Sequence, residues 1–343
     1  MNPGNSLDDF RATAICRGLD EIAAAQLLAM AEPVSFLAGS RLVQQGEAAR
    51  GAYVLRQGKV EARVSLSGGG EKTVAVLGAG SMFGEMALLE HGACTASVVA
   101  IENVDGWFIE HEPFRALTAG RNPAALAIQR TITAGLIARL GALNAELRKQ
   151  PSPEDRPAAA LPPANKPLAH VPRRGRTTFD HRRFLPGLPF FAGFSADEID
   201  VAVANIGVCD IARGQWLFVA GQPADACFLV VRGAIEVSAR IEAQERRMAL
   251  LGPGMLVGYM SVLGGTPHGA SARARENATL LEFPADDFMS LYHANSGAAV
   301  KVQRGIHRNL LQSLARSNSQ MSRLVTQAKL NAALQARLIQ AAI

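Results

Sequence analysis

Two long stretches of the chain are built from short segments in which apolar and polar residues alternate. AYVLRQGKVEARVSL (residues 52–66) and CFLVVRGAIEVSARI (residues 227–241) are the clearest examples, and each has a glycine near its middle. Alternation with a period of two around a glycine turn predicts paired antiparallel strands. We therefore expect an antiparallel β unit at the centre of each half of the chain.

Helical patterns flank both of these β units. LDEIAAAQLLAM (residues 19–30) and SADEIDVAVANI (residues 195–206) precede the strands. Apolar residues with helical spacing follow them, over residues 123–148 in the first half and from residue 296 onward in the second. Spacing of three and four residues predicts amphipathic helices. Each half is therefore expected to run helix, small barrel, helix.

The two halves also share the spacing of their glycines. Three glycines of the first half recur 175 residues later, and two more glycines, a phenylalanine and an arginine recur 174 residues later. The pairs are Gly39 and Gly214, Gly46 and Gly221, Gly58 and Gly233, Gly80 and Gly254, Gly84 and Gly258, Phe114 and Phe288, and Arg130 and Arg304. Such a constant offset indicates an internal repeat, with one residue lost between the two groups.

Prolines set residues 149–182 apart from both copies. QPSPEDRPAAALPPANKPLAHVPRRGRTT (residues 150–178) has no helical or strand period, which predicts an extended linker between domains at residues 1–148 and 183–343. The linker ends in a basic group, interpreted as a solvated edge or as a docking site for an acidic partner. RRGRT in this group also resembles a basophilic kinase site or inhibitor segment. The group comprises Arg173, Arg174, Arg176, Arg182 and Arg183.

Composition narrows the class of protein. The chain has 343 residues, of which 48% are apolar and 19% charged, as in folded globular proteins. A formal net charge of +5 is too small to indicate nucleic-acid binding. The first residues lack the basic start of a signal peptide, and no segment has the length and apolarity of a membrane span. The cysteines have no metal-ligand or redox spacing, so we expect no metal site and a reducing, cytoplasmic location. They are Cys16, Cys94, Cys209 and Cys227.

Three motifs occur in the same order in both halves. The first half contains GSRLVQQG, YVLRQGKVE and LGAGSMFGEMALLEHGACTASVVA, and the second contains GQWLFVAG, FLVVRGAIEV and LGPGMLVGYMSVLGGTPHGASARA. Residues 15–148 and 184–328 resemble the cyclic-nucleotide-binding domains of protein kinase A regulatory subunits, gated channels and the bacterial catabolite-activator group. The resemblance implies an α+β fold of two tandem β jelly-roll barrels, each flanked by helices, with a long C-terminal helix.

The last motif of each half is similar to the family's phosphate-binding cassette. In the family, an acidic residue after the cassette glycine takes the ribose hydroxyl, and an arginine nine residues later pairs with the cyclic phosphate. Here Glu85 and Cys94 stand at these two positions in the first copy. The resemblance implies the first ligand-binding set Gly84, Glu85, Met86, Ala87, Cys94, Thr95 and Ser97. The second set is Gly258, Tyr259, Met260, Ser261, His268, Gly269 and Ser271.

Neither copy has the arginine that pairs with the cyclic phosphate in the family, which weakens the case for an anionic ligand. A hydrogen bond to a charged group contributes about 1.5 to 3 kcal/mol, which is roughly ten- to a hundredfold in affinity. His268 supplies a positive charge when protonated, since its reference pKa is about 6.5, so we expect tighter binding at pH 6 than at pH 8. The other interpretation is that the glycine turns serve folding alone, Cys94 is a small hydrophobe, and Ser97 and Ser271 are packing residues.

Both long helices carry an apolar stripe that needs a cover. We expect a homodimer through these helices, with pairing of the two helices inside one chain as the alternative. The second helix runs almost to the last residue, so we expect no DNA-binding domain. The stripes are Ile128, Ile132, Leu136, Leu140, Leu143 and Leu147, and Leu310, Leu314, Met321, Leu324, Ala328 and Leu338.

Chemistry-bearing residues show no catalytic arrangement. The histidines are isolated, and the nucleophile, phosphate-loop, zinc and dinucleotide motifs are missing. We therefore expect no catalytic residues and a non-enzymatic regulatory protein. Cyclic AMP or cyclic GMP is the possible ligand, and a protein partner receives the signal. The alternatives are a pseudo-sensor whose degenerate pockets bind no cyclic nucleotide and which acts as a dimeric scaffold, and a kinase-type regulatory subunit that uses RRGRT as bait.

Overall fold

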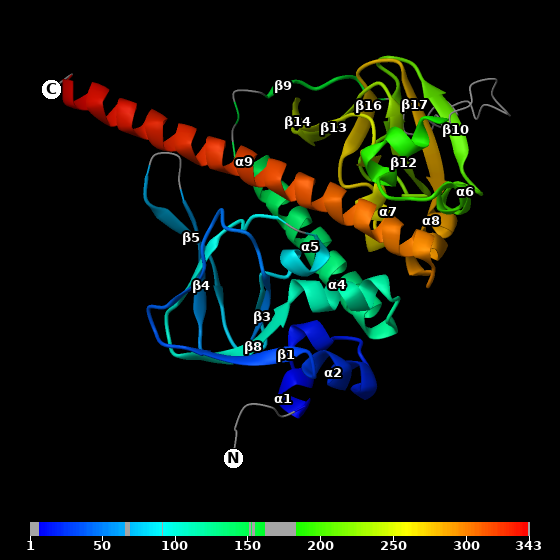
Figure 1. Ribbon diagram of the computed structural model, residues 1–343. Helices are drawn as coiled ribbons and strands as arrows, with labels where there is room; N and C mark the ends of the chain where they lie inside the picture. Colours follow the sequence, from blue (N-terminus) through cyan, green and yellow to red (C-terminus); the bar gives the residue numbers. More distant parts are fainter. Residues whose placement is uncertain are drawn as a thin grey trace. The chain divides into compact units, whose positions relative to one another are not determined.

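A computed structural model describes residues 7–65, 69–90, 92–150, 152, 155–161 and 183–341, with side chains up to residue 327 (Figure 1). The chain forms two compact units. One runs to Gly135 and also takes in the chain from Met321 onward, and the other is Leu136–Gln320. This division differs from the predicted boundaries at residues 148 and 183, because the second half of one long helix and the start of the linker pack within the second unit.

The first unit contains one barrel of two four-stranded antiparallel sheets. The strand orders are β1-β8-β3-β6 and β2-β7-β4-β5. The strands are β1 (Ala31–Phe36), β2 (Arg41–Val43), β3 (Gly51–Gln57), β4 (Val60–Ser65), β5 (Glu71–Leu77), β6 (Met82–Phe83), β7 (Ser97–Ala100) and β8 (Val104–Glu110). The helices are α1 (Leu7–Arg11), η1 (Ala14–Cys16), α2 (Glu21–Leu28), α3 (Met86–Leu89), α4 (His111–Ala119) and the start of α5 (Pro123–Lys149), which enters the second unit at Leu136.

The second unit repeats this topology strand for strand. Its orders are β10-β17-β12-β15 and β11-β16-β13-β14, with β9 (Arg156–Pro157) added beside β14. The strands are β10 (Gly207–Ile211), β11 (Trp216–Phe218), β12 (Ala226–Arg232), β13 (Ile235–Ile241), β14 (Gln244–Leu251), β15 (Leu256–Val257), β16 (Ser271–Ala274) and β17 (Ala278–Pro284). The helices are η3 (Leu185–Gly187), η4 (Pro189–Phe191), α6 (Ala196–Ala202), α7 (Tyr259–Gly264), α8 (Ala285–His293) and α9 (Gly297–Ala341), of which α9 belongs to this unit up to Gln320. The predicted tandem jelly-roll fold is confirmed.

The repeated glycines explain why the same barrel forms twice. Gly58 and Gly233 have φ angles of +87° and +84°, which L side chains rarely adopt. A Cβ atom on Gly58 would lie 2.1 Å from the carbonyl oxygen of Asn103, and one on Gly233 would lie 2.5 Å from that of Asn277. Backbone therefore passes too close to these turns for any residue except glycine.

The start of the predicted linker is part of the second barrel. Arg156 and Pro157 pair with Glu245 and Gln244 at the edge of β14. The guanidinium group of Arg246 donates to both carboxylate oxygens of Asp155, at 2.6 Å each. Residues 155–161 of the predicted linker are therefore held against the second barrel by a buried ion pair and a strand pairing. Of the basic group, Arg173, Arg174, Arg176 and Arg182 lie outside the described residues.

The two long helices have the predicted buried stripes. Leu310 and Leu314 of α9 are buried, Met321 and Leu324 are half-buried, and the side chains of Ala328 and Leu338 lie outside the described residues. In α5 all six stripe residues are buried except Leu143, which is half-buried. Within the second unit, Ser317 of α9 donates to Asn144 of α5 at 2.9 Å, so the helices contact each other inside one chain. None of the helices in the described ranges is long and apolar enough to span a membrane.

Candidate functional site

The second cassette turns sharply between β15 and α7. Gly258 has a φ angle of +80° and lies directly before α7. A Cβ atom there would lie 3.1 Å from Cε1 of His268 and 3.2 Å from Cε1 of Phe218. Glycine is therefore required both by the backbone conformation and by the two rings packed against it.

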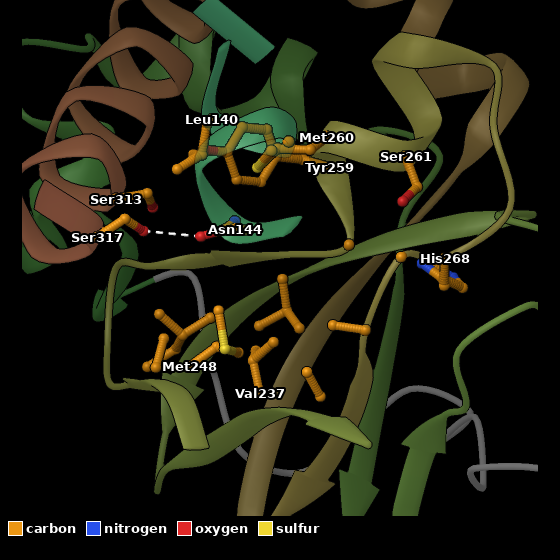
Figure 2. Close-up of a pocket in the computed structure, with 18 of the residues that line it drawn as sticks. Leu140, Asn144, Val237, Met248, Tyr259, Met260, Ser261, His268, Ser313 and Ser317 are labelled. Atoms are coloured by element: carbon orange, nitrogen blue, oxygen red, sulfur yellow. Dashed lines mark hydrogen bonds between the residues drawn. The ribbon is translucent and has the colours of Figure 1, made fainter. Parts of the chain in front are cut away.

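A cavity of about 200 Å³ lies beside this turn, and we call it the cassette cavity. Gly258, Tyr259, Met260, Ser261, His268 and Gly269 of the predicted set line it, whereas Ser271 does not. Most of the remaining wall is apolar. Further lining residues are Phe218, Val237, Met248 and Leu251 of the barrel, Leu140, Asn144 and Arg148 of α5, and Ser313, Arg316 and Ser317 of α9 (Figure 2).

Tyr259 stands where the family has its acidic residue, and its side chain is directed toward the long helices (Figure 2). Its side chain extends from α7 toward Leu140 and Ser313 on the long helices (Figure 2). The residue is 4% exposed, and its hydroxyl makes no hydrogen bond of normal geometry with a described group, although Ser313 lies near it. Burial raises the pKa of Tyr259 well above its usual value, and Ser313 and Arg316 oppose this only in part. The hydroxyl is therefore a neutral, buried donor at the cavity.

His268 packs as a neutral ring rather than as a cation. It stacks on Phe218 with ring centroids 3.7 Å apart and an interplanar angle of 6°. Burial lowers the pKa of His268 to about 4, and Asp225 opposes this effect. Tighter binding at pH 6 than at pH 8 stays a prediction, and the lowered pKa means that His268 carries little charge at either pH in this structure.

The same backbone contacts hold Cys94 and His268, the residues that stand where the family has its arginine. The amide of Gly46 donates to the carbonyl of Cys94 at 2.9 Å, and the amide of Gly221 donates to the carbonyl of His268 at 2.8 Å. These hydrogen bonds join backbone atoms only, so the turn forms with either side chain. Ser97 and Ser271 likewise accept hydrogen bonds from the amides of Gln45 and Ala220, at 3.0 Å each. These contacts favour a structural role for both serines.

The first cassette has a shorter helix and another set of contacts. Gly84 has a φ angle of +74°, and α3 has only four residues. Glu85 and Met86 are half-buried and Thr95 is exposed. Ala87 is buried, and its carbonyl accepts a hydrogen bond from Nδ1 of His111. Burial and, to a lesser extent, Glu47 raise the pKa of Cys94, so its half-buried thiol is protonated.

The sequence profile described as "Cyclic nucleotide-binding domain" matches residues 33–121 and 208–295, just over half of the chain. The chain belongs to the cyclic nucleotide-binding domain family. Two matched domains also agree with the two barrels of the fold. Residues 33–121 lie within the first domain and residues 208–295 within the second.

The matches to two curated relatives are each about as long as one domain of this chain. "Cyclic AMP receptor protein" of Thermus thermophilus is 34% identical over 108 residues, 31% of this chain and 50% of the relative. "CRP-like cAMP-activated global transcriptional regulator" of Mycobacterium tuberculosis is 28% identical over 116 residues, 34% of this chain and 52% of the relative. The chain therefore spans about half the length of these curated relatives.

Similar solved structures include a regulatory domain of a PKA and a domain of a transcriptional regulator. The regulatory domain of Toxoplasma gondii PKA with cAMP has 16% identity and a TM-score of 0.31, with 84% of this chain and 91% of that chain covered. The N-terminal domain of a transcriptional regulator from Streptomyces coelicolor has 27% identity and a TM-score of 0.34, with 36% of this chain and 89% of that chain covered.

Residues on the helix side of the cassette cavity were missed by the sequence reasoning. Arg316, Ser313 and Ser317 of α9 and Asn144 of α5 line the cyclic-nucleotide-binding domain's cavity from outside the cassette. One signal was present, because Ser317 interrupts the apolar stripe of α9. A polar residue in a buried stripe needs a polar partner, which here is Asn144.

Acid should destabilise the second cyclic-nucleotide-binding domain through His268. The unfolded chain binds a proton at His268 below about pH 6.5, whereas the folded state excludes it until about pH 4. The free energy of unfolding should therefore fall by about 3 kcal/mol from this group between pH 6.5 and pH 4, at 1.36 kcal/mol per pKa unit. His307, whose pKa burial lowers to about 3, adds a fall in the same direction.

His268→Phe is the variant that isolates this effect. It keeps a ring on Phe218 and removes the titrating group. Urea unfolding at pH 7 and pH 4.5 should show a smaller acid-induced loss in the variant than in the wild type. Equal losses in the two proteins would mean that His268 is not the group responsible.

Proposed function

We propose that the protein is a ligand-responsive, non-enzymatic regulatory protein, in which the second domain binds a small molecule and α9 carries the change to a protein partner. The cassette cavity is the observation that carries this proposal. Its wall combines the cassette with Asn144 of α5 and Ser313 and Ser317 of α9. A ligand there contacts both parts, and its differential affinity for two positions of the helix would shift the population between them.

A buried side chain joins the helix to the cassette directly. Asn309 of α9 is 7% exposed, and its Oδ1 accepts a hydrogen bond from the amide of Leu256 at 2.9 Å. Its Nδ2 donates to the carbonyl of Gly305 at 2.9 Å. Leu256 belongs to β15, which leads into the cassette glycine Gly258. A shift of the cassette therefore displaces a partner of α9, which supports coupling between ligand and helix.

Titration calorimetry combined with hydrogen exchange on the full chain tests the proposal. The probes are cyclic AMP and cyclic GMP, because cAMP stands in the names of the relatives, together with cyclic dinucleotides and apolar carboxylates. We expect one of these probes to bind and to change amide exchange over the first half of α9, to Gln320. Failure of every probe to bind at millimolar concentration would contradict the proposal and support the scaffold alternative.

Asn309→Leu is expected to uncouple the helix from the cassette. The buried amide of Leu256 loses its acceptor, which should lower the free energy of unfolding by about 1 to 3 kcal/mol. Ligand affinity should change less than the exchange response of α9, which should largely disappear. Gln312→Leu, at an exposed position of the same helix, is the matched control. An exchange response in Asn309→Leu as large as in the wild type would exclude this route.

The scaffold alternative rests on the cassettes themselves. Both lack the family arginine, with Cys94 and His268 in its place, and Glu85 keeps a negative charge beside the first cassette turn. In that function the tandem barrels assemble partners without binding a cyclic nucleotide. A homodimer through the long helices stays a prediction for both functions, and light scattering on the purified full chain tests it. The RRGRT segment lies outside the described residues.

A further inference from the structure

Two arginines line the cassette cavity, one of which reaches the cassette from α5 and one of which extends from α9. Arg148 of α5 reaches the cassette, where it donates to the carbonyl of Gly269 at 3.2 Å, whereas Arg316 extends from α9, and no aspartate or glutamate is among the described lining residues. The cassette side presents the neutral ring of His268. The cavity therefore attracts an anionic group, and because Arg148 already donates to a cassette carbonyl, Arg316 is the cation left for that group.

Arg316 of α9 is a half-buried cation whose described contacts are all uncharged. Its guanidinium group donates to Oγ of Ser313 at 3.0 Å and approaches Sδ of Met255 at 3.9 Å. Within the described ranges no carboxylate lies at ion-pair distance, and burial lowers the pKa of Arg316. A partly desolvated guanidinium group gains most from a charge-assisted, bidentate hydrogen bond, which a carboxylate supplies.

Tyr259 supplies a second sign of a ligand group at the same place. Its hydroxyl is buried and without a normal hydrogen bond to a described group, and it lies near Ser313 and Arg316. A buried donor left unsatisfied is costly, so an acceptor from a ligand would relieve it. Two donors from different elements therefore converge on one small region of the cavity.

The opposite wall of the cavity is suited to an apolar body. Val237 of β13 and Met248 and Leu251 of β14 face it, and Phe218 adds a ring on the cassette side. These side chains offer no hydrogen bonds for the hydroxyl groups of a ribose. Polar groups buried there would lose their water without replacement, whereas an apolar chain gains from burial.

We infer that the cassette cavity takes an apolar monoanion of the medium-chain carboxylate class, with the carboxylate at Arg316 and Tyr259 and the hydrocarbon chain against β13 and β14. This rests on the proposed function, because it specifies the ligand of the same site. The ligand has the reverse orientation from one that places its anionic group at the cassette turn.

Calorimetry of the full chain with octanoate and 1-octanol tests the inference, since the two probes share a chain and differ in charge. Octanoate should bind at least roughly tenfold tighter than 1-octanol. Arg316→Gln should weaken octanoate by roughly ten- to a hundredfold and leave 1-octanol within about threefold. Arg316→Lys should keep part of the preference. Arg323→Gln, an exposed position on the same helix, should behave as the wild type.

Several results would overturn this ligand class. Equal affinity for octanoate and 1-octanol, or unchanged octanoate affinity in Arg316→Gln, excludes a carboxylate held by Arg316. Should Arg316→Gln fail to fold, as judged by its thermal transition, Arg316→Lys and Tyr259→Phe carry the test, and wild-type octanoate affinity in both excludes the inference. If cyclic AMP binds and octanoate does not, the inference is refuted and the proposed function still stands. Silence of every probe would refute both.

Discussion

Replacing Arg246 by methionine is expected to lower the free energy of unfolding by about 3 to 5 kcal/mol, because the change leaves a buried carboxylate unpaired. Arg246 is 6% exposed, and it pairs with Asp155 and donates to the carbonyl groups of Leu147 and Gln150. The hydrogen bonds from Arg246 hold the pKa of Asp155 below its usual value. Guanidinium chloride unfolding at pH 7 measures the effect.

Two further variants test whether the loss of stability comes from the ion pair between Arg246 and Asp155. Arg247→Met, at the next and exposed position of β14, should change the free energy of unfolding by less than about 0.5 kcal/mol. Adding Asp155→Asn to Arg246→Met should recover part of the loss, because the unpaired charge is gone. A loss below about 1 kcal/mol in Arg246→Met would show that residues 155–161 are not held by this ion pair.

Phe288→Ala is expected to lower the free energy of unfolding of the second domain by about 3 to 5 kcal/mol. The side chain is fully buried and meets the ring of Phe283 edge-on, with centroids 5.8 Å apart. Removal leaves a cavity in the core that also contains Phe190 and Phe191. Hydrogen exchange in β12 and β17 measures the loss within the full chain.

Phe114→Ala is the matched variant, since Phe114 is the repeat partner of Phe288 and equally buried. It should accelerate exchange in β3 and β8 and leave binding in the cassette cavity unchanged. Phe288→Ala should instead weaken binding there. A loss below about 1 kcal/mol for Phe288→Ala would contradict its place in the core.

The repeat could be predicted from the sequence because its signals are local. Gly58 and Gly233 mark turns whose positive φ angles only glycine adopts easily, and the alternating segments on either side mark strands. The cassette turn at Gly258 follows from the same reasoning. Six of the seven residues expected at the second site do line one cavity, since they lie close together along the chain.

Side-chain chemistry at the site could not be predicted in this way. The sequence places a histidine nine residues after Tyr259, but its pKa depends on burial and on the ring of Phe218, which comes from another strand. Arg316 is likewise an ordinary position on a long helix until the fold brings it to Tyr259. Neither environment is encoded by nearby residues.

The sequence alone therefore determined the tandem barrels, the position of each cassette and the missing arginines, because turns and strands follow from short-range patterns. Only the tertiary structure decided the neutral state of His268, the docking of Asp155 on Arg246, and the arginines that line the cavity. Burial and ion pairing join residues that are distant along the chain. Those contacts, and the pKa values that they set, exist only once the chain has folded.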